Sequence, residues 1–242
     1  MHRLVLISIL APLLCGCART EHIPQYQWTN SQAALSDLAA RARAVRSVSA
    51  QCDITLTRTD GQSVRLDGAV VMKPPTSVRL RAWKMGQAVF DLTLNADGAW
   101  IVMPDDPNQK DRVLPAGASA AKFAHGWAGL SGEFFLADDA KVIDSGGPRF
   151  QVIRTIDGQL VTCEVDRSTL TVRRYAIADS AGTKHFTLTE DQYEMIGGIP
   201  WPTHLVAQSE RGTIEIHLHD VELNAELPSG ALIPPARAQK LP

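Results

Sequence analysis

The five residues Glu215-Ile216-His217-Leu218-His219 place three polar side chains at alternate positions of one segment. In a β-strand, alternate side chains share a face, so Glu215, His217 and His219 would all project in the same direction. Imidazole and carboxylate groups are ligands of first-row metal ions, and His217 and His219 form the core of a candidate metal site. His204 is the obvious donor of a further ligand from a neighbouring strand.

Plain alternation is the simpler interpretation of this segment. Ile214, Ile216 and Leu218 would point into an apolar interior, while the polar side chains between them face water. A metal site on an exposed strand face would lack the surrounding groups that hold ligand histidines in place. We therefore favour alternation, and we expect no metal and no other cofactor.

The remaining polar residues do not build a recognisable catalytic site. The sequence contains no G-x-S-x-G, no H-E-x-x-H, no P-loop and no dinucleotide-binding glycine pattern. The carboxylate pairs at 105–106 and 138–139 lie in loop-like sequence without a nearby histidine. The formal net charge is −2 and no basic run occurs, so nucleic acid is not an expected partner. These features favour a protein that is not an enzyme.

The elements that must position the polar residues are β-strands. From residue 68 to residue 104 the side chains alternate with a period of two, with Phe90, Leu92 and Leu94 on one face and polar residues between them. Turn-forming residues interrupt the alternation at 73–75, 84–86 and 95–98. The pattern predicts a four-stranded antiparallel meander with one apolar face.

Similar alternation elsewhere predicts further strands and two helices in a single domain. A helix that Asn30 or Ser31 caps has an apolar face running from Leu35 to Val48, and a second, small-residue-rich helix covers 119–130. Its residues Phe123, Trp127 and Leu130 form a candidate lid. We predict a mainly β (α+β) fold of about eleven strands covered by two or three short helices. The first strand of the meander is expected at 64–73, and the further strands at 49–58, 149–156, 159–166, 170–178, 184–193, 203–209 and 213–223.

The apolar phase of these strands would line one concave face. A closed small barrel fills such a space with side chains, whereas an incompletely closed barrel can hold a ligand. Cys52 and Cys163 are on this phase, either as a disulfide or, as we favour, as two buried thiols. The candidate lining residues are Ile54, Leu56, Phe90, Leu92, Leu94, Val161, Ile214, Ile216 and Leu218.

The first residues predict export and lipid attachment. A short basic start and an apolar run over 4–14 are typical of a signal peptide, and Leu14-Cys15-Gly16-Cys17 resembles a bacterial lipobox. An ordinary secretory signal is the alternative. We expect a signal peptide at 1–16, a lipidated N-terminus at Cys17 with a tether at 17–29, and a folded domain at 30–242. Ala18 after the lipidated cysteine favours the outer membrane.

Over roughly residues 45 to 227 the chain resembles the LolA/LolB lipoprotein-localisation superfamily. The resemblance is distributed over turns and strand starts rather than concentrated in one motif. The matching residues are Val48-Ser49-Ala50, Gly68, Pro74-Pro75, Val78-Arg79-Leu80, Met85-Gly86, Val89-Phe90-Asp91-Leu92, Asp97-Gly98-Ala99-Trp100, Trp127-Ala128-Gly129-Leu130, Gly197-Gly198-Ile199-Pro200, Asp220-Val221-Glu222-Leu223-Asn224 and Leu227-Pro228.

The resemblance implies a half-open antiparallel barrel, curled round a hydrophobic cavity that shelters acyl chains and lidded by helices. The LolB-type receptor is itself a lipoprotein, and it uses a protruding apolar residue between two strands to deliver cargo. Met85 takes that position here, flanked by Trp83.

The implied function is that of a lipid-anchored protein on the periplasmic face of the outer membrane. It would bind lipid or lipoprotein acyl chains in lipoprotein sorting or insertion, with a periplasmic carrier protein among its partners. The alternative is a structural envelope lipoprotein that binds a protein partner and has a filled interior.

Overall fold

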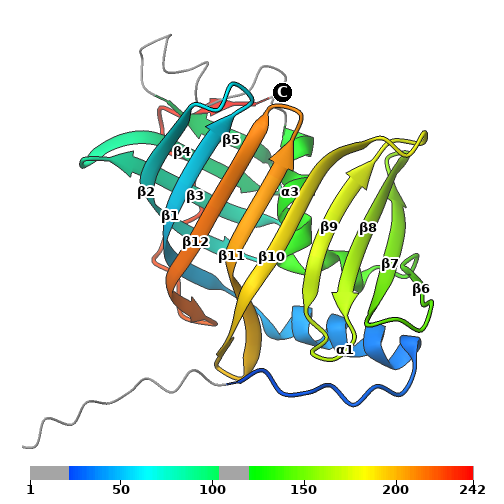
Figure 1. Ribbon diagram of the computed structural model, residues 1–242. Coiled ribbons are helices and arrows are strands. Elements are labelled where there is room, and N and C mark those ends of the chain that lie inside the picture. The colour runs from blue at the N-terminus through cyan, green and yellow to red at the C-terminus, as the bar shows by residue number, and fades with distance from the viewer. Residues whose placement is uncertain (1–21, 104–119, 242) are drawn as a thin grey trace, which may run out of the picture.

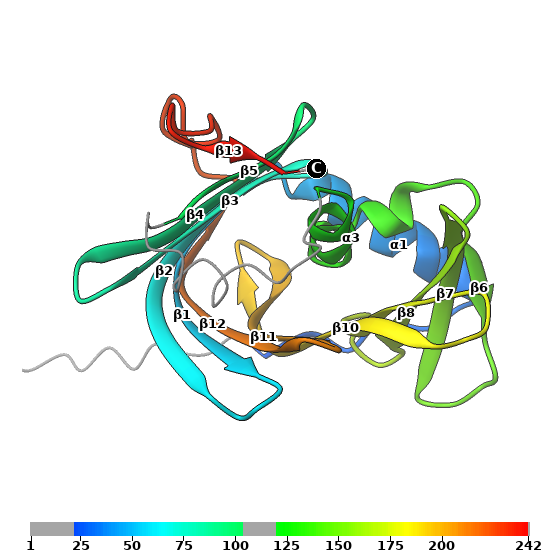
Figure 2. The ribbon, with the colours of Figure 1, turned by 90° about the horizontal axis from the view of Figure 1, so that it is seen from above.

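One antiparallel sheet forms the frame of the molecule. The computed structural model describes residues 22–103 and 120–241, and the strands in these residues join in the order β13-β5-β4-β3-β2-β1-β12-β11-β10-β9-β8-β7-β6. The sheet curves strongly, and its two end strands, β13 and β6, do not pair with each other (Figures 1 and 2). The expected mainly β, half-open barrel is therefore confirmed.

The N-terminal strands follow the predicted meander. Val78, Leu80 and Ala82 are buried on the concave face beside Phe90 and their neighbours on the next strand, as the period-two pattern predicts. The bounds are β1 Val48–Arg58, β2 Ser63–Lys73, β3 Ser77–Lys84, β4 Gln87–Asn95 and β5 Gly98–Val102.

The C-terminal strands extend the same sheet in the other direction. Two of them, β7 and β8, have the bounds that the sequence predicts. The short strands β6 and β13 add one strand to each edge and were not predicted. The bounds are β6 Lys141–Ile143, β7 Arg149–Ile156, β8 Gln159–Asp166, β9 Val172–Ala178, β10 Lys184–Ile196, β11 Ile199–Ser209, β12 Gly212–Leu223 and β13 Gln239–Lys240.

The hairpin between β10 and β11 is longer than the sequence predicts. We expected these strands to stop at residue 193 and resume at 203, but they continue to Ile196 and restart at Ile199. Pro200 and Pro202 obscured the strand, because proline cannot donate to a sheet ladder. Both prolines pair with β10 alone, since the pairing of β11 with β12 begins only at His204.

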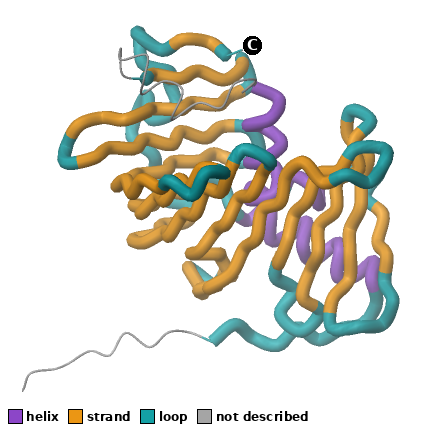
Figure 3. The backbone as a smooth tube through the Cα atoms, turned by 45° about the horizontal axis from the view of Figure 1, so that its top comes forward, coloured by secondary structure: helices purple, strands orange, loops and turns teal. Residues whose placement is uncertain are grey.

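The helices lie on the concave side of the sheet (Figures 2 and 3). They are α1 (Ser31–Ala44), α3 (Ala120–Ser131) and the 3₁₀ helix η1 (Glu133–Leu136). Asn30 caps α1 as expected, because its side-chain oxygen accepts a hydrogen bond from the Ala33 amide at 2.8 Å. No helix in the described ranges is both long and apolar enough to cross a membrane.

The apolar face predicted for the first helix is only partly helical. The helix ends at Ala44, and Val45 is extended, so Val45 and Val48 are buried from the following chain and from β1. Before α1, the segment assigned to the tether packs on the body from Tyr26 onward. Trp28 contacts Phe150 with ring centroids 5.2 Å apart and lies beneath the Arg167 guanidinium at 3.9 Å.

Candidate functional site

Helix α3 covers an apolar trough on one half of the sheet. This half runs from β13 to β11 in the strand order, and we call it the lidded half. Side chains of α3 enter the trough and leave a void of only about 10 Å³ between helix and strands. The lining residues come from α3 and from five neighbouring strands, β3, β2, β1, β12 and β11, and all are apolar. They are Val48, Val70, Met72, Leu80, Trp127, Leu130, Trp201, Leu205, Ile216 and Leu218.

One of the two glycines in α3 lets the helix approach the strands closely. A Cβ atom at Gly129 would lie 2.9 Å from Cγ of Tyr175 and 3.3 Å from a methyl carbon of Leu188. A Cβ atom at Gly126 would lie 3.5 Å from the Phe186 ring, an ordinary contact distance. Glycine inside a helix costs about 1 kcal/mol relative to alanine. Gly129 is therefore explained by close packing on β9 and β10.

The predicted lining residues fall into four groups. Ile216 and Leu218 line the void, and Ile54, Phe90, Leu92 and Leu94 are buried on the concave face without lining it. Leu56 is half-buried, and Ile214 is 41% exposed beside the start of β12. Val161 is fully buried, but in the other half of the sheet.

Of the three candidate lid residues, Trp127 and Leu130 enter the void. Phe123 falls within α3, but its side chain lies outside the described residues. Trp201 was not predicted as a lining residue, because the prolines on either side hid its strand. Its indole N–H is buried without an acceptor among the described residues.

The other half of the sheet is packed solid, and we call it the filled half. Helix η1 inserts Phe134 against Tyr175, with ring centroids 5.7 Å apart in an edge-to-face arrangement. Both side chains are at most 1% exposed. Cys163 lies in this half and Cys52 in the lidded half, and both are buried free thiols as we favoured. Burial raises the pKa of the Cys52 thiol to about 12, so this thiol is unreactive.

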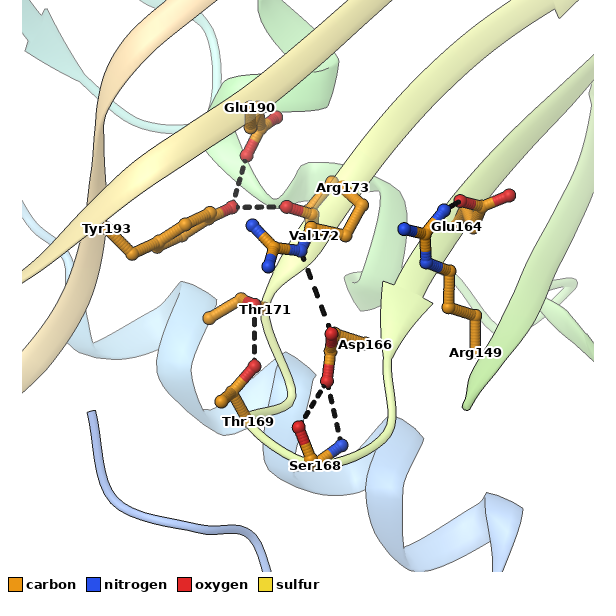
Figure 4. A network of polar contacts seen from close by, with 10 residues as sticks. All are labelled: Arg149, Glu164, Asp166, Ser168, Thr169, Thr171, Val172, Arg173, Glu190 and Tyr193. Atoms are coloured by element: carbon orange, nitrogen blue, oxygen red, sulfur yellow. Dashed lines mark hydrogen bonds and ion pairs between the residues drawn. The ribbon is translucent and has the colours of Figure 1, made fainter. Parts of the chain in front are cut away.

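A buried carboxyl group marks the boundary between the two halves. Glu190 is 3% exposed on β10, and burial raises its pKa to about 8, although a hydrogen bond with Tyr193 opposes the shift. The Tyr193 hydroxyl lies 2.7 Å from the Val172 carbonyl and 2.8 Å from Glu190 (Figure 4). The hydroxyl is the donor in both contacts, and a bond donated to a carboxylate favours its ionised form. Burial outweighs that bond and favours the neutral form of Glu190.

The hairpin between β3 and β4 exposes an apolar tip. Met85 is 91% exposed with φ of 51°, and Gly86 follows with φ of 76°. Positive φ at both central residues is typical of a type I′ turn, which favours asparagine and glycine. A left-handed backbone costs an ordinary L-residue about 1–2 kcal/mol. Met85 is therefore poorly suited to this position for folding alone. Trp83, in the same hairpin, is half-buried.

The histidines group differently from the sequence prediction. Ligand atoms of His204, Glu215 and His217 all lie within 4.8 Å of one another, whereas His219 is exposed outside this group. The His204 ring is 13% exposed, so the expectation of a wholly exposed cluster is wrong. Burial lowers the pKa of His204, but its hydrogen bonds to Glu215 and Asp191 outweigh burial and raise it overall.

A larger hollow lies away from both halves, near the start of the described chain. It measures about 410 Å³ and is bounded by the segment before α1, by α1 itself and by the β10–β11 hairpin. Its wall includes Tyr26, whose hydroxyl donates to Asp37 at 2.7 Å, and Arg41, which donates to the Leu170 carbonyl. Its walls thus combine polar groups with apolar side chains such as Ile23 and Met195.

Comparisons with known proteins identify the fold. No protein-family model matches the chain, and no curated protein matches its sequence. A crystal structure of a LolA superfamily protein from Nitrosomonas europaea matches 83% of this chain and 97% of its own, at 13% identity and a TM-score of 0.56. A DUF1329 family protein from Desulfovibrio piger matches 83% and 96%, at 15% identity and a TM-score of 0.57.

A third solved structure matches the chain over a similar length and at similarly low identity. It is described as an outer membrane lipoprotein-sorting protein domain from Vibrio parahaemolyticus, and it matches 83% of this chain and 95% of its own. The identity is 11% and the TM-score 0.55. At these identities the likeness concerns the fold alone, and the chain has the LolA/LolB-like fold that its turns and strand starts resemble.

Proposed function

We propose that this protein is a non-enzymatic, lipid-anchored envelope protein that binds acyl chains of lipids or lipoproteins beneath α3 and acts in outer-membrane lipoprotein sorting. The observation that supports this most strongly is the trough itself. Its walls are entirely apolar, and what occupies it is one short, glycine-containing helix. Proteins of the same fold include a LolA superfamily protein and a lipoprotein-sorting domain.

Cargo binding requires α3 to leave the trough. When Trp127 and Leu130 withdraw, an acyl chain replaces them against the same strand residues. Each methylene group that moves out of water contributes about 0.8 kcal/mol, so a long chain offsets the loss of the helix contacts. Trp201 adds a buried N–H donor beside this path, suited to an ester or amide carbonyl of the cargo.

Delivery in this proposal uses the β3–β4 hairpin. Met85 is exposed and apolar, and its flexible, polarizable side chain adapts to lipid tails. Trp83 flanks it, and aromatic side chains of this kind favour membrane interfaces. The tip would enter the target leaflet while the cargo leaves the trough.

The anchor in this proposal is lipid on Cys17, which lies outside the described residues. Acylation would hold the domain at the periplasmic face of the outer membrane. We expect Cys17→Ser to move the protein from the membrane fraction to the soluble periplasm. Fractionation of cells that produce each form tests this, and an unchanged membrane fraction would refute the anchor without affecting cargo binding.

Two alanine substitutions in α3 test cargo binding. Gly129→Ala forces the helix away from Tyr175, whereas Gly126→Ala leaves an ordinary contact with Phe186. Both changes raise helix propensity equally, so they differ only in how well α3 fits the strands. We expect Gly129→Ala to bind a fluorescent long-chain fatty acid more tightly than the parent, because less of the protein is held closed. Gly126→Ala should bind as the parent does.

The same titration distinguishes the structural alternative. The small void favours a protein whose interior stays filled and which binds a protein partner instead of lipid. In that case neither the parent nor Gly129→Ala binds the fatty acid. If the parent and both variants bind the fatty acid with the same affinity, the protein binds lipid but α3 is not the lid.

A further inference from the structure

A row of polar residues crosses the convex face of the sheet, on the side opposite the trough. The strand register pairs Asp191 of β10 with His204 of β11, and His204 with His217 of β12. Glu215 lies two residues before His217 and therefore on the same face of β12. Three adjacent strands thus bring two imidazoles and two carboxylates together.

The distances in this cluster converge on one carboxylate oxygen. Oε1 of Glu215 lies 2.9 Å from Nε2 of His204 and 3.1 Å from Nε2 of His217. The two imidazole rings are stacked, with centroids 4.2 Å apart and planes inclined by 16°. Ligand atoms in a tetrahedral zinc site with bonds of about 2.0–2.1 Å lie roughly 3.3 Å apart. Small side-chain rotations would therefore bring these three atoms round one ion.

Asp191 gives the cluster the support that an exposed site lacks. Its carboxylate lies 2.6 Å from Nδ1 of His204. In metal sites the second ring nitrogen of a ligand histidine characteristically donates to a carboxylate, which fixes the tautomer and directs the other nitrogen at the metal. The side chain of His204 is only 13% exposed, whereas His217 is 46% exposed. The cluster therefore has one shielded ligand and one side open to water.

We propose that His204, Glu215 and His217 bind a divalent transition-metal ion of the Zn²⁺ class, with Asp191 as the positioning residue for His204. Two imidazole nitrogens and one carboxylate oxygen are a donor set suited to Zn²⁺, Ni²⁺ or Cu²⁺ rather than Mg²⁺ or Ca²⁺. Solvent completes the coordination on the exposed side. The ion takes the place of the hydrogen-bonding proton on each Nε2 atom, so binding releases protons. This site is independent of the lipid-binding proposal.

Zinc titration of the full chain, stripped of metal with a chelator, tests the site. Isothermal titration calorimetry should show one ion per chain, and the ion should raise the melting temperature by binding only the folded form. His217→Gln should abolish this binding. His219→Gln is the matched control, because it alters an exposed histidine two residues along the same strand face. It should leave the affinity unchanged.

Asp191→Asn separates positioning from ligation. We expect it to weaken zinc affinity about 10- to 100-fold while leaving one ion per chain. Histidine resonances followed by NMR should show zinc-dependent shifts for His204 and His217 but not for His219. A parent protein that binds no zinc would overturn the proposal. So would His217→Gln that folds and binds zinc with the parental affinity.

Discussion

The two halves of the concave face are built from the same alternating strands but are closed in different ways. In the filled half, Phe134 of η1 packs edge-to-face on Tyr175, and both rings are almost wholly buried. In the lidded half, α3 contributes Trp127 and Leu130, which stay half-buried. Its Gly129 packs on Tyr175 at the edge of the filled half. An aromatic plug is difficult to withdraw, whereas a small-residue helix can separate at lower cost. In the proposed function, the filled half is structural and the lidded half exchanges its contents.

The largest expected effect is on the aromatic plug. Phe134→Ala removes a buried ring and should lower the free energy of unfolding by about 3–5 kcal/mol. Trp127→Ala removes a larger side chain that is only half-buried, and we expect a loss of about 1–2 kcal/mol. Urea unfolding of both variants measures the two values. Equal losses would mean that the halves do not differ in how tightly they are packed.

The buried carboxyl at the boundary predicts a pH dependence of stability. The pKa of Glu190 is raised from 4.5 to about 8, so between these values the folded state holds a proton that the unfolded state has lost. Stability contributed by this group therefore falls as pH rises from about 4.5 to about 8, and the total change is a few kcal/mol.

Glu190→Gln tests this assignment, because the amide keeps an oxygen that accepts from Tyr193 and carries no charge at any pH. The stability of the variant, measured by urea unfolding from pH 5 to pH 8 with a chelator present, should decline less than that of the parent. Parallel curves for the two proteins would show that Glu190 is ionised in the folded state.

The smallest expected change in stability concerns the lidded half and its hairpin tip. Met85→Asn should stabilise the fold by about 1 kcal/mol, because asparagine tolerates a left-handed backbone better than methionine. The proposal predicts that the same change slows transfer of bound lipid to liposomes. Met85→Leu keeps an apolar side chain at the tip and should transfer at nearly the parental rate. If Met85→Asn transfers lipid at the parental rate, the hairpin tip has no role in delivery.

Local patterns predicted much of this fold, and long-range register explains what they missed. Alternation placed β7 and β8 at their observed bounds, because each face of a strand is visible in its own sequence. Pro200 and Pro202 concealed the start of β11 and with it Trp201. The resemblance of the loop to that of the LolB-type receptor indicated Met85 as the exposed tip. It did not indicate the positive φ of Met85, because methionine rarely adopts that backbone conformation.

The polar sites depended still more on tertiary structure. The sequence suggested His217 with His219 and named His204 as a further donor from a neighbouring strand. The structure joins His217 to His204 across strands, leaves His219 outside the group and places Asp191 behind His204. Glu190 and Tyr193 are three residues apart, a spacing that puts side chains on opposite faces of a regular strand. The left-handed backbone at Gln192, with φ of 49°, interrupts that alternation, and no residue pattern predicts it.

Amide hydrogen exchange tests the central claim most directly, that α3 opens while the filled half stays closed. Without ligand, the amides of α3 should exchange far faster than those of β7 and β8, because opening of α3 does not require global unfolding. Addition of a long-chain fatty acid should change exchange in α3 and in the strands beneath it and leave β7 and β8 unaltered. Exchange in α3 as slow as in β8, with no response to fatty acid, would contradict the account.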